Sequence, residues 1–132
     1  MYCMRIMNKF NVNKNILAMF YNSVICGVWQ YNLLSWGGNT RTEDKNAIDA
    51  IIRQASRLIG EVQPSLATSY QRRLGMKLQK IIQDNGHPLS VILHNAVIPR
   101  SGRMRLPYSS TNRHLSSFIP QCIKFHNLTF KR

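Results

Sequence analysis

Acidic side chains are scarce in this sequence of 132 residues. It contains 5 Asp and Glu against 18 Lys and Arg, which gives a formal net charge of +13 at pH 7. Residues 1–61 hold seven basic and four acidic residues, a net of +3, whereas residues 62–132 hold eleven basic residues and Asp84 as their one acid, a net of +10. This charge exceeds what solubility requires of a small domain. It predicts a polyanionic partner, nucleic acid first and an acidic membrane surface second, bound by the second half of the chain.

Cysteine is also rare, and its pattern excludes a disulfide framework. The three residues Cys3, Cys26 and Cys122 are odd in number and lie far apart. Such usage is typical of a reducing compartment. Basic residues precede an apolar run near the N-terminus, but no small-residue cleavage site follows, so a signal peptide is not favoured. We therefore expect an intracellular protein, nuclear or cytoplasmic.

The common catalytic motifs are missing. The sequence contains neither a Gly-Lys-Ser/Thr phosphate loop nor a Gly-x-Ser-x-Gly nucleophile elbow. Cys122 and His126, with His114 upstream, are three candidate zinc ligands, but a structural site needs a fourth ligand and usually a close first pair. We favour Cys122 as a small core residue. The expectation is a protein that is not an enzyme, with no metal, no cofactor and no small-molecule substrate.

The longest uncharged stretch runs from Asn15 to Thr40 and contains both tryptophans. Its length could span about 30 Å of hydrocarbon, but a membrane span should be apolar on all sides. On a helical wheel one face is apolar and the opposite face is polar. The apolar face comprises Ile16, Phe20, Val24, Val28, Tyr31 and Leu34, and the polar face comprises Asn15, Asn22, Ser23, Cys26 and Gln30. We predict one helix over residues 13–36 that buries the apolar face, and a membrane partner is not favoured.

The remaining pattern is also helical. Thr40-Arg41-Thr42-Glu43 matches a capping box, and Gly60 is a plausible stop for the helix that follows. Pro64-Ser65 opens a third helix that reaches about Gln83. A short helix over residues 89–97 and a last one over residues 120–126, docked through Phe118, Ile119, Ile123 and Phe130, complete the chain. The fold class is therefore all-α, a small bundle of four to five helices with a basic, partly irregular C-terminal third. As one domain it divides into a poorly ordered leader (1–12), the bundle (13–97) and a basic loop with a short helix (98–132).

Basic side chains gather at two places in the second half. Arg73, Lys77 and Lys80 recur at helical spacing, with Arg72 beside them, although like charges at such spacing repel. Residues 99–107 carry three arginines between two prolines, and arginine can grip phosphate bidentately. A solvated helix face and a flexible connector are the alternative interpretations. The candidate nucleic-acid-binding residues are Arg72, Arg73, Lys77, Lys80, Arg100, Arg103, Arg105 and Arg113.

A series of short motifs runs along most of the chain. They are Phe10-Asn11-Val12, Met19-Phe20-Tyr21-x-Ser23-Val24-Ile25, Tyr31-x4-Trp36-Gly37-Gly38, Ile51-Ile52-x2-Ala55-Ser56-x-Leu58-Ile59-Gly60, His87-Pro88-Leu89, Ile98-Pro99-Arg100-Ser101-Gly102-Arg103, Arg113 and Ser117-Phe118-Ile119-Pro120. In this order and spacing they resemble the C-terminal region of LINE-type (non-LTR) retrotransposon reverse transcriptases, especially in fish elements. The resemblance covers about residues 9 to 128.

The resemblance implies the thumb and the segment after it, which help to hold template and primer beside the polymerase palm. The adjacent aspartate pair of the palm and the endonuclease module have no counterpart in this sequence. The expectation is a truncated, non-catalytic remnant that binds the backbone of RNA or DNA, with a polymerase domain as a further partner. Met1 to Asn8 match nothing in that region, which suggests a start inside a longer reading frame. Two alternatives stay open: an inactive structural fragment that needs the missing palm, and a small membrane-associated basic protein.

Overall fold

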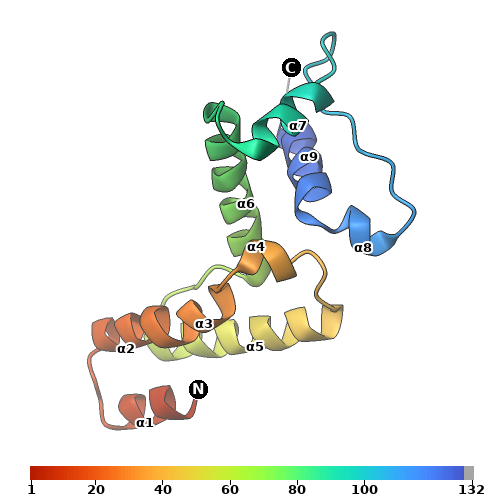
Figure 1. Ribbon diagram of the computed structural model, residues 1–132. Helices are drawn as coiled ribbons and strands as arrows, with labels where there is room; N and C mark the ends of the chain where they lie inside the picture. Colours follow the sequence, from red (N-terminus) through yellow and green to blue (C-terminus); the bar gives the residue numbers. More distant parts are fainter. Residues whose placement is uncertain (130–132) are drawn as a thin grey trace. The chain divides into compact units, whose positions relative to one another are not determined.

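The computed structural model describes residues 1–129, and over that range the chain is all-α, as predicted (Figure 1). One isolated antiparallel bridge, between Val97 and Met104, is the exception to helix and loop among these residues. The helices are α1 (Tyr2–Lys9), α2 (Lys14–Phe20), the π-helical segment η1 (Tyr21–Cys26), α3 (Gly27–Gln30), α4 (Leu33–Trp36), α5 (Thr42–Ile59), α6 (Leu66–Gln83), α7 (Pro88–Ala96), α8 (Asn112–Leu115) and α9 (Phe118–Thr129).

The chain forms two compact units, each with its own core. Unit 1 consists of Met1–Leu33 and Thr40–Ser69, and unit 2 consists of Leu34–Asn39 and the chain from Tyr70 onward. These units do not coincide with the expected boundaries after residues 12 and 97. The boundary between unit 1 and unit 2 falls inside α6. The apolar periodicity of the sequence predicts α6 as one continuous helix and gives no sign of this boundary.

The expected poorly ordered leader is instead helix α1. Its Met4 is fully buried in a cluster with Leu17 and Tyr21, and Met1 and Met7 pack against the same cluster. Three methionines at a spacing of three residues share one helical face. Their side chains are flexible enough to fill irregular gaps in a core. The prediction failed because the segment is too short to show a clear period.

The expected single helix over residues 13–36 is interrupted. A π-helical segment follows α2, Tyr31 has a non-helical backbone, and Asn32 has a positive φ of 46° before α4 begins. The predicted inward face was wrong at four of its six residues, since Ile16, Val24, Val28 and Tyr31 are 51%, 49%, 75% and 80% exposed. The other two, Phe20 and Leu34, are partly buried against the core clusters. The buried residues are Leu17, Tyr21, Trp29 and Leu33.

Two physical reasons explain this reversal. Apolar residues such as Leu17, Ile25 and Trp29 also lie outside the predicted apolar face, so hydrophobicity alone does not select the inward face. In addition, a π-helical turn uses i→i+5 hydrogen bonds and rotates the residues after it out of phase with an ideal α-helix. The face that is buried contains the larger rings of Tyr21 and Trp29, which bury the most apolar area. What remains outside is a largely apolar surface.

Helix α5 ends as predicted but begins differently. Gly60 adopts a left-handed conformation with φ 85°, and Glu43 and Asp44 occupy the first turn, where the helix dipole favours negative charge. The capping box was wrong: the helix begins at Thr42, and Arg41 is its N-cap without a side-chain hydrogen bond. The Arg41 carbonyl accepts the first backbone bond, from the N–H of Lys45. Thr40 therefore precedes the capping position.

Helix α6 follows the predicted bounds closely. The Ser65 hydroxyl accepts the N–H of Thr68 at 3.2 Å, and a carboxylate oxygen of Asp49 accepts the N–H of Leu66 at 2.9 Å. These bonds satisfy amide groups that a helix start leaves without partners. The sequence predicted that this helix opens at Pro64-Ser65. The contribution of Asp49 comes from the helix before it and has no local signature.

Unit 2 closes its core around α6. Buried side chains of α6, α7, the following loop and α9 form one cluster, which consists of Leu74, Leu78, Ile81, Leu93, Met104, Cys122 and Ile123. Gly75 lets α9 approach α6, because a Cβ there would lie 2.9 Å from the Phe125 ring. Helix α9 is longer than the expected 120–126, and Phe130, a predicted docking residue, lies outside the described residues.

Candidate nucleic-acid interface

The exposed side of α6 carries the first group of candidate residues. Leu74, Leu78 and Ile81 are buried, whereas Arg72, Arg73, Lys77 and Lys80 are all exposed. With about 100° between successive residues, Arg73, Lys77 and Lys80 lie within about 60° of one another around the helix. Arg72 lies roughly 100° from Arg73 and faces another direction. The helix therefore brings three of the four together, and we call Arg73, Lys77 and Lys80 the α6 basic stripe.

The acidic residue nearest to this stripe in the sequence forms a hydrogen bond within a turn. Asp84 follows Lys80 by four residues, a spacing at which a helix can pair opposite charges. However, α6 ends at Gln83, and a carboxylate oxygen of Asp84 accepts the N–H of Gly86 at 3.0 Å. His87 then caps α7, since its Nδ1 accepts the N–H of Leu89 at 3.1 Å. Asp84 thus belongs to the turn between α6 and α7 rather than to the helix that carries the stripe.

The arginine-rich loop forms a small hairpin rather than a flexible connector. Val97 and Met104 form an antiparallel bridge, the N–H of Ile98 donates to the Arg103 carbonyl at 2.7 Å, and the N–H of Arg105 donates to the Ala96 carbonyl at 2.6 Å. Gly102 supplies the positive φ of 66° that the turn requires. We call residues 97–105 the arginine hairpin. Its backbone is held by its own hydrogen bonds.

Asn127 fastens this hairpin to α9. Its side-chain oxygen accepts the N–H of Met104 at 2.8 Å, and its side-chain nitrogen donates to the Met104 carbonyl at 2.9 Å. The Met104 side chain is buried, with 4% exposed. Because side chains alternate along extended backbone, Arg103 and Arg105 project to the other side, and both are exposed. Their Cα atoms are about 6.6 Å apart at roughly 3.3 Å per residue.

Sequence reasoning did not select Asn127. The two partners are 23 residues apart, and an asparagine near the end of a helix has no periodicity that marks it as an anchor. The exposed Lys124 on α9 was also missed, because it stands alone among apolar residues. Both residues belong to the helix that supports the hairpin.

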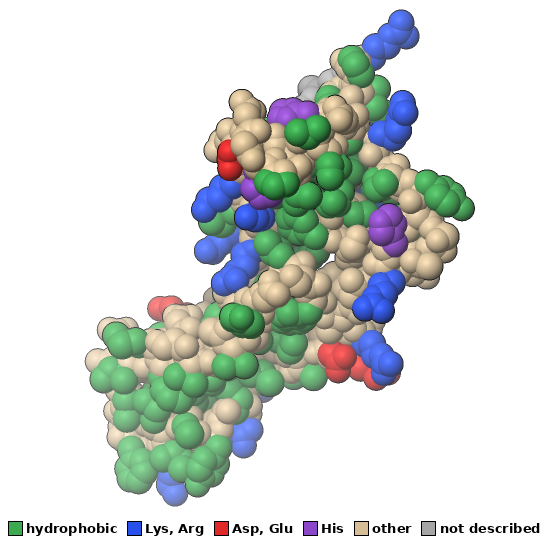
Figure 2. Space-filling view, in the orientation of Figure 1, with side chains coloured by type: hydrophobic (Ala, Val, Ile, Leu, Met, Phe, Trp, Pro, Cys, Tyr) green, Lys and Arg blue, Asp and Glu red, His purple; other side chains and the backbone are tan. Residues whose placement is uncertain are grey.

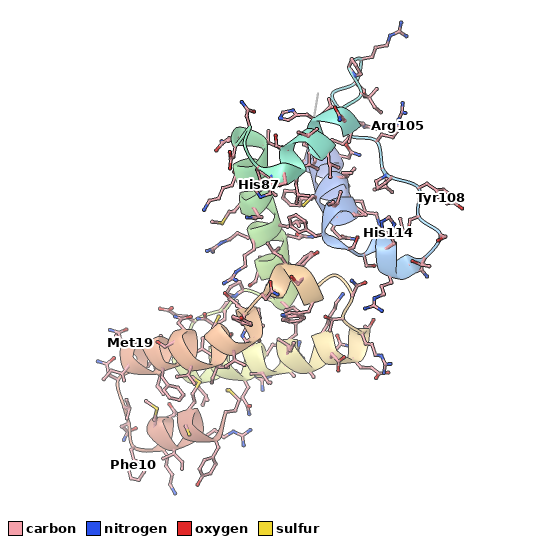
Figure 3. The ribbon with its side chains drawn as sticks, viewed as in Figure 1. Phe10, Met19, His87, Arg105, Tyr108 and His114 are labelled. Atoms are coloured by element: carbon pink, nitrogen blue, oxygen red, sulfur yellow. The ribbon has the colours of Figure 1, made fainter. Side chains whose placement is uncertain are left out.

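The third group of candidate side chains lies after the hairpin. Arg113 is exposed on α8, a single turn whose N-cap residue Thr111 accepts the N–H of His114 at 3.3 Å. In Figure 3, Arg105 and His114 lie on one side of α9, whereas α6 lies on the other side. Within unit 2 the candidate residues therefore form two surfaces. Figure 2 shows Lys and Arg side chains along α6 and, separately, around the hairpin.

The sulfur and imidazole groups do not assemble a metal site. Cys122 is fully buried in the core of unit 2, as predicted, and burial raises the pKa of its thiol to about 12. A thiol with so high a pKa is a poor metal ligand, because metals bind the thiolate. Burial also raises the pKa of Tyr70, with a smaller contribution from Cys122. Among the described residues, no three His, Cys, Asp or Glu side chains are grouped as a metal ion would need.

Within residues 1–129, none of the helices combines the length and the apolar character needed to cross a bilayer. No family model, curated protein or solved structure matches this chain. The resemblance to retrotransposon reverse transcriptases therefore stays a hypothesis that depends on the quoted motifs alone.

Proposed function

We propose that this chain is a non-catalytic module that binds the phosphate backbone of RNA or DNA through unit 2. The observation that carries the proposal is the arginine hairpin. Its backbone is anchored by Asn127, and it displays Arg103 and Arg105 in a region without any acid after Asp84. Anchoring matters, because a backbone that is already held in place loses less entropy when its side chains meet a phosphate.

Two further features support this function. The α6 basic stripe adds a second surface of like charge, which costs helix stability unless an anion lies opposite. Guanidinium and ammonium groups on exposed surfaces contact phosphates and do not read base sequence, so we expect little sequence specificity. The resemblance to a region that holds template and primer agrees with this chemistry. In this proposal the chain contributes backbone binding and carries out no catalysis itself.

Salt titration of the intact chain tests the proposal. Each phosphate contact releases counterions, so the logarithm of the association constant should fall linearly with the logarithm of salt concentration, by about 0.9 per contact on duplex DNA. With three to eight contacts the expected slope lies between about −3 and −7. Filter binding between about 50 and 200 mM salt measures it. A flat plot would refute the phosphate role.

A second candidate function is favoured by the surface of unit 1. Ile16, Met19, Val24, Val28 and Tyr31 are all between 49% and 80% exposed and belong to α2, η1, α3 and the residue after it. We call these five residues the exposed apolar patch. Single exposed apolar residues are ordinary, but a group on one segment marks an interaction site. This patch suits a structural segment that packs against another domain, and the resemblance suggests a polymerase palm.

Solubility of the isolated chain tests this second candidate. We expect the wild-type protein to self-associate as its concentration rises, and the double variant Met19→Gln/Val28→Gln to remain monomeric, since it removes exposed apolar area. Both side chains are exposed, so the free energy of unfolding should change by less than about 0.5 kcal/mol. Light scattering during size-exclusion chromatography measures the oligomeric state. Met76→Gln, a half-exposed site on α6, is the control. A monomeric wild-type chain at high concentration would contradict the role of the exposed apolar patch.

A further inference from the structure

One aromatic side chain in unit 2 takes no part in the core. Tyr108 is 92% exposed, and it stands in the segment between the arginine hairpin and α8. Figure 3 shows it directed away from the helices, on the same side of α9 as Arg105 and His114. An exposed tyrosine ring presents a large apolar face to water, and burying this face against a ligand would be favourable.

The segment that carries Tyr108 is fastened at both ends. On one side, the Arg105 N–H donates to the Ala96 carbonyl. On the other side, the Ser109 hydroxyl donates to the Thr111 carbonyl at 2.9 Å, and the Thr111 hydroxyl caps α8. Pro107 fixes its own φ directly before the tyrosine. The ring is therefore displayed from a restrained backbone, which lowers the entropy cost of binding through it.

In the sequence, exposed arginines both precede and follow Tyr108. Arg105 precedes Tyr108 by three residues, so their Cα atoms are at most about 11 Å apart. Arg113 follows by five residues, and both arginines are exposed. Phosphate-binding cations beside an exposed aromatic ring are the combination that binds single-stranded nucleic acid, in which bases stack on the ring while the backbone follows the charge.

We propose that Tyr108 is a stacking platform for an unpaired base, so that the ligand of the arginine hairpin is single-stranded nucleic acid. This inference rests on the backbone-binding function proposed above and adds a substrate class to it. In a duplex the bases are stacked on one another and cannot cover the ring. Single strands and loops present free base faces, and every base has one, so the contact needs no particular sequence.

Three ligands distinguish the contribution of base stacking from that of charge. They are a single strand of about 12 nucleotides, an abasic strand of the same length, and a duplex. The abasic strand keeps the phosphates and lacks the bases. We expect Tyr108→Ala to bind the intact strand roughly 5- to 150-fold more weakly than the wild type, and the other two ligands within about twofold. Tyr108→Phe should behave as the wild type, because it keeps the ring. Fluorescence anisotropy of labelled ligands measures all of these affinities.

The outcomes distinguish this inference from the function on which it rests. If the wild-type chain binds the strands with the expected salt dependence and Tyr108→Ala matches it on the intact strand, stacking is overturned and the backbone function stands. Equal losses in Tyr108→Ala and Tyr108→Phe would assign the effect to the hydroxyl and also overturn stacking. If the wild type binds none of the three ligands at low salt, both proposals fail. Circular dichroism melting should be unchanged in each variant, because the side chain is exposed.

Discussion

Reversing two charges on α6, with Lys77→Glu and Lys80→Glu together, is expected to weaken nucleic-acid binding at least about 100-fold at roughly 0.1 M salt. Losing two phosphate contacts alone removes about 1.8 from the salt slope, which amounts to roughly 60-fold at that concentration. Two carboxylates facing phosphates add repulsion to this loss. The fold should persist, because both positions are exposed and a glutamate at position 77 follows Arg73 by four residues.

The matched control is Arg53→Glu/Arg57→Glu on α5. It changes the net charge by the same amount, at two exposed basic residues one helical turn apart in unit 1. These arginines line a hollow of about 410 Å³, together with Asp49, Ser56 and Gln63. Filter binding on both variants, each over a range of salt, gives the comparison. A larger loss in the α5 variant would move the binding site to that hollow and contradict the role of the α6 basic stripe.

The parts of the fold that could be predicted are those in which charge and apolar character alternate clearly. Helices α5 and α6 have basic or polar side chains opposite a narrow apolar row, so a single helical phase satisfies both solvent and core. Gly60 and Ser65 then mark an end and a start with conformations or hydrogen bonds that few other residues supply as well. Local chemistry is sufficient in these places.

Residues 13–36 show why the same method fails elsewhere. Ile16 and Leu17 are adjacent, both apolar, and only one of them can face the core. The choice depends on α1 and α5, which supply Met4, Ala55 and Ile59 to the cluster around Leu17. That information is tertiary. A helical wheel of one segment does not include contacts with other helices, and the π-helical turn changes the helical phase of the residues that follow it.

The arrangement of the candidate site residues could likewise be predicted only in part. Arg73, Lys77 and Lys80 could be placed on one face from spacing alone, because a helix fixes their relative directions. The three arginines of residues 99–107 could be named but not arranged, since the directions of Arg103 and Arg105 depend on the bonds between Asn127 and Met104. The sequence did not mark Tyr108 as a candidate, because the exposure of its ring is a property of the fold.

Ile81→Ala is expected to lower the free energy of unfolding by about 2–5 kcal/mol. The side chain is fully buried on α6 and packs in the cluster that also contains Leu93 from α7 and Ile123 from α9. Removing three carbon atoms there loses their transfer free energy and leaves a cavity that the neighbouring helices can fill only in part. A loss of this size is a large fraction of the stability of a small domain.

Tryptophan fluorescence during urea unfolding can follow unit 2 separately. Trp36 belongs to unit 2 and Trp29 to unit 1, so a Trp29→Phe background leaves Trp36 as the reporter of the affected core. Met76→Ala in the same background is the control. That side chain is 51% exposed on the same helix, and alanine favours helix, so its stability should change by less than about 0.5 kcal/mol. Equal midpoints for the Ile81 and Met76 variants would show that α6 does not bury the face assigned to it, and the outward direction of Lys77 and Lys80 would be contradicted with it.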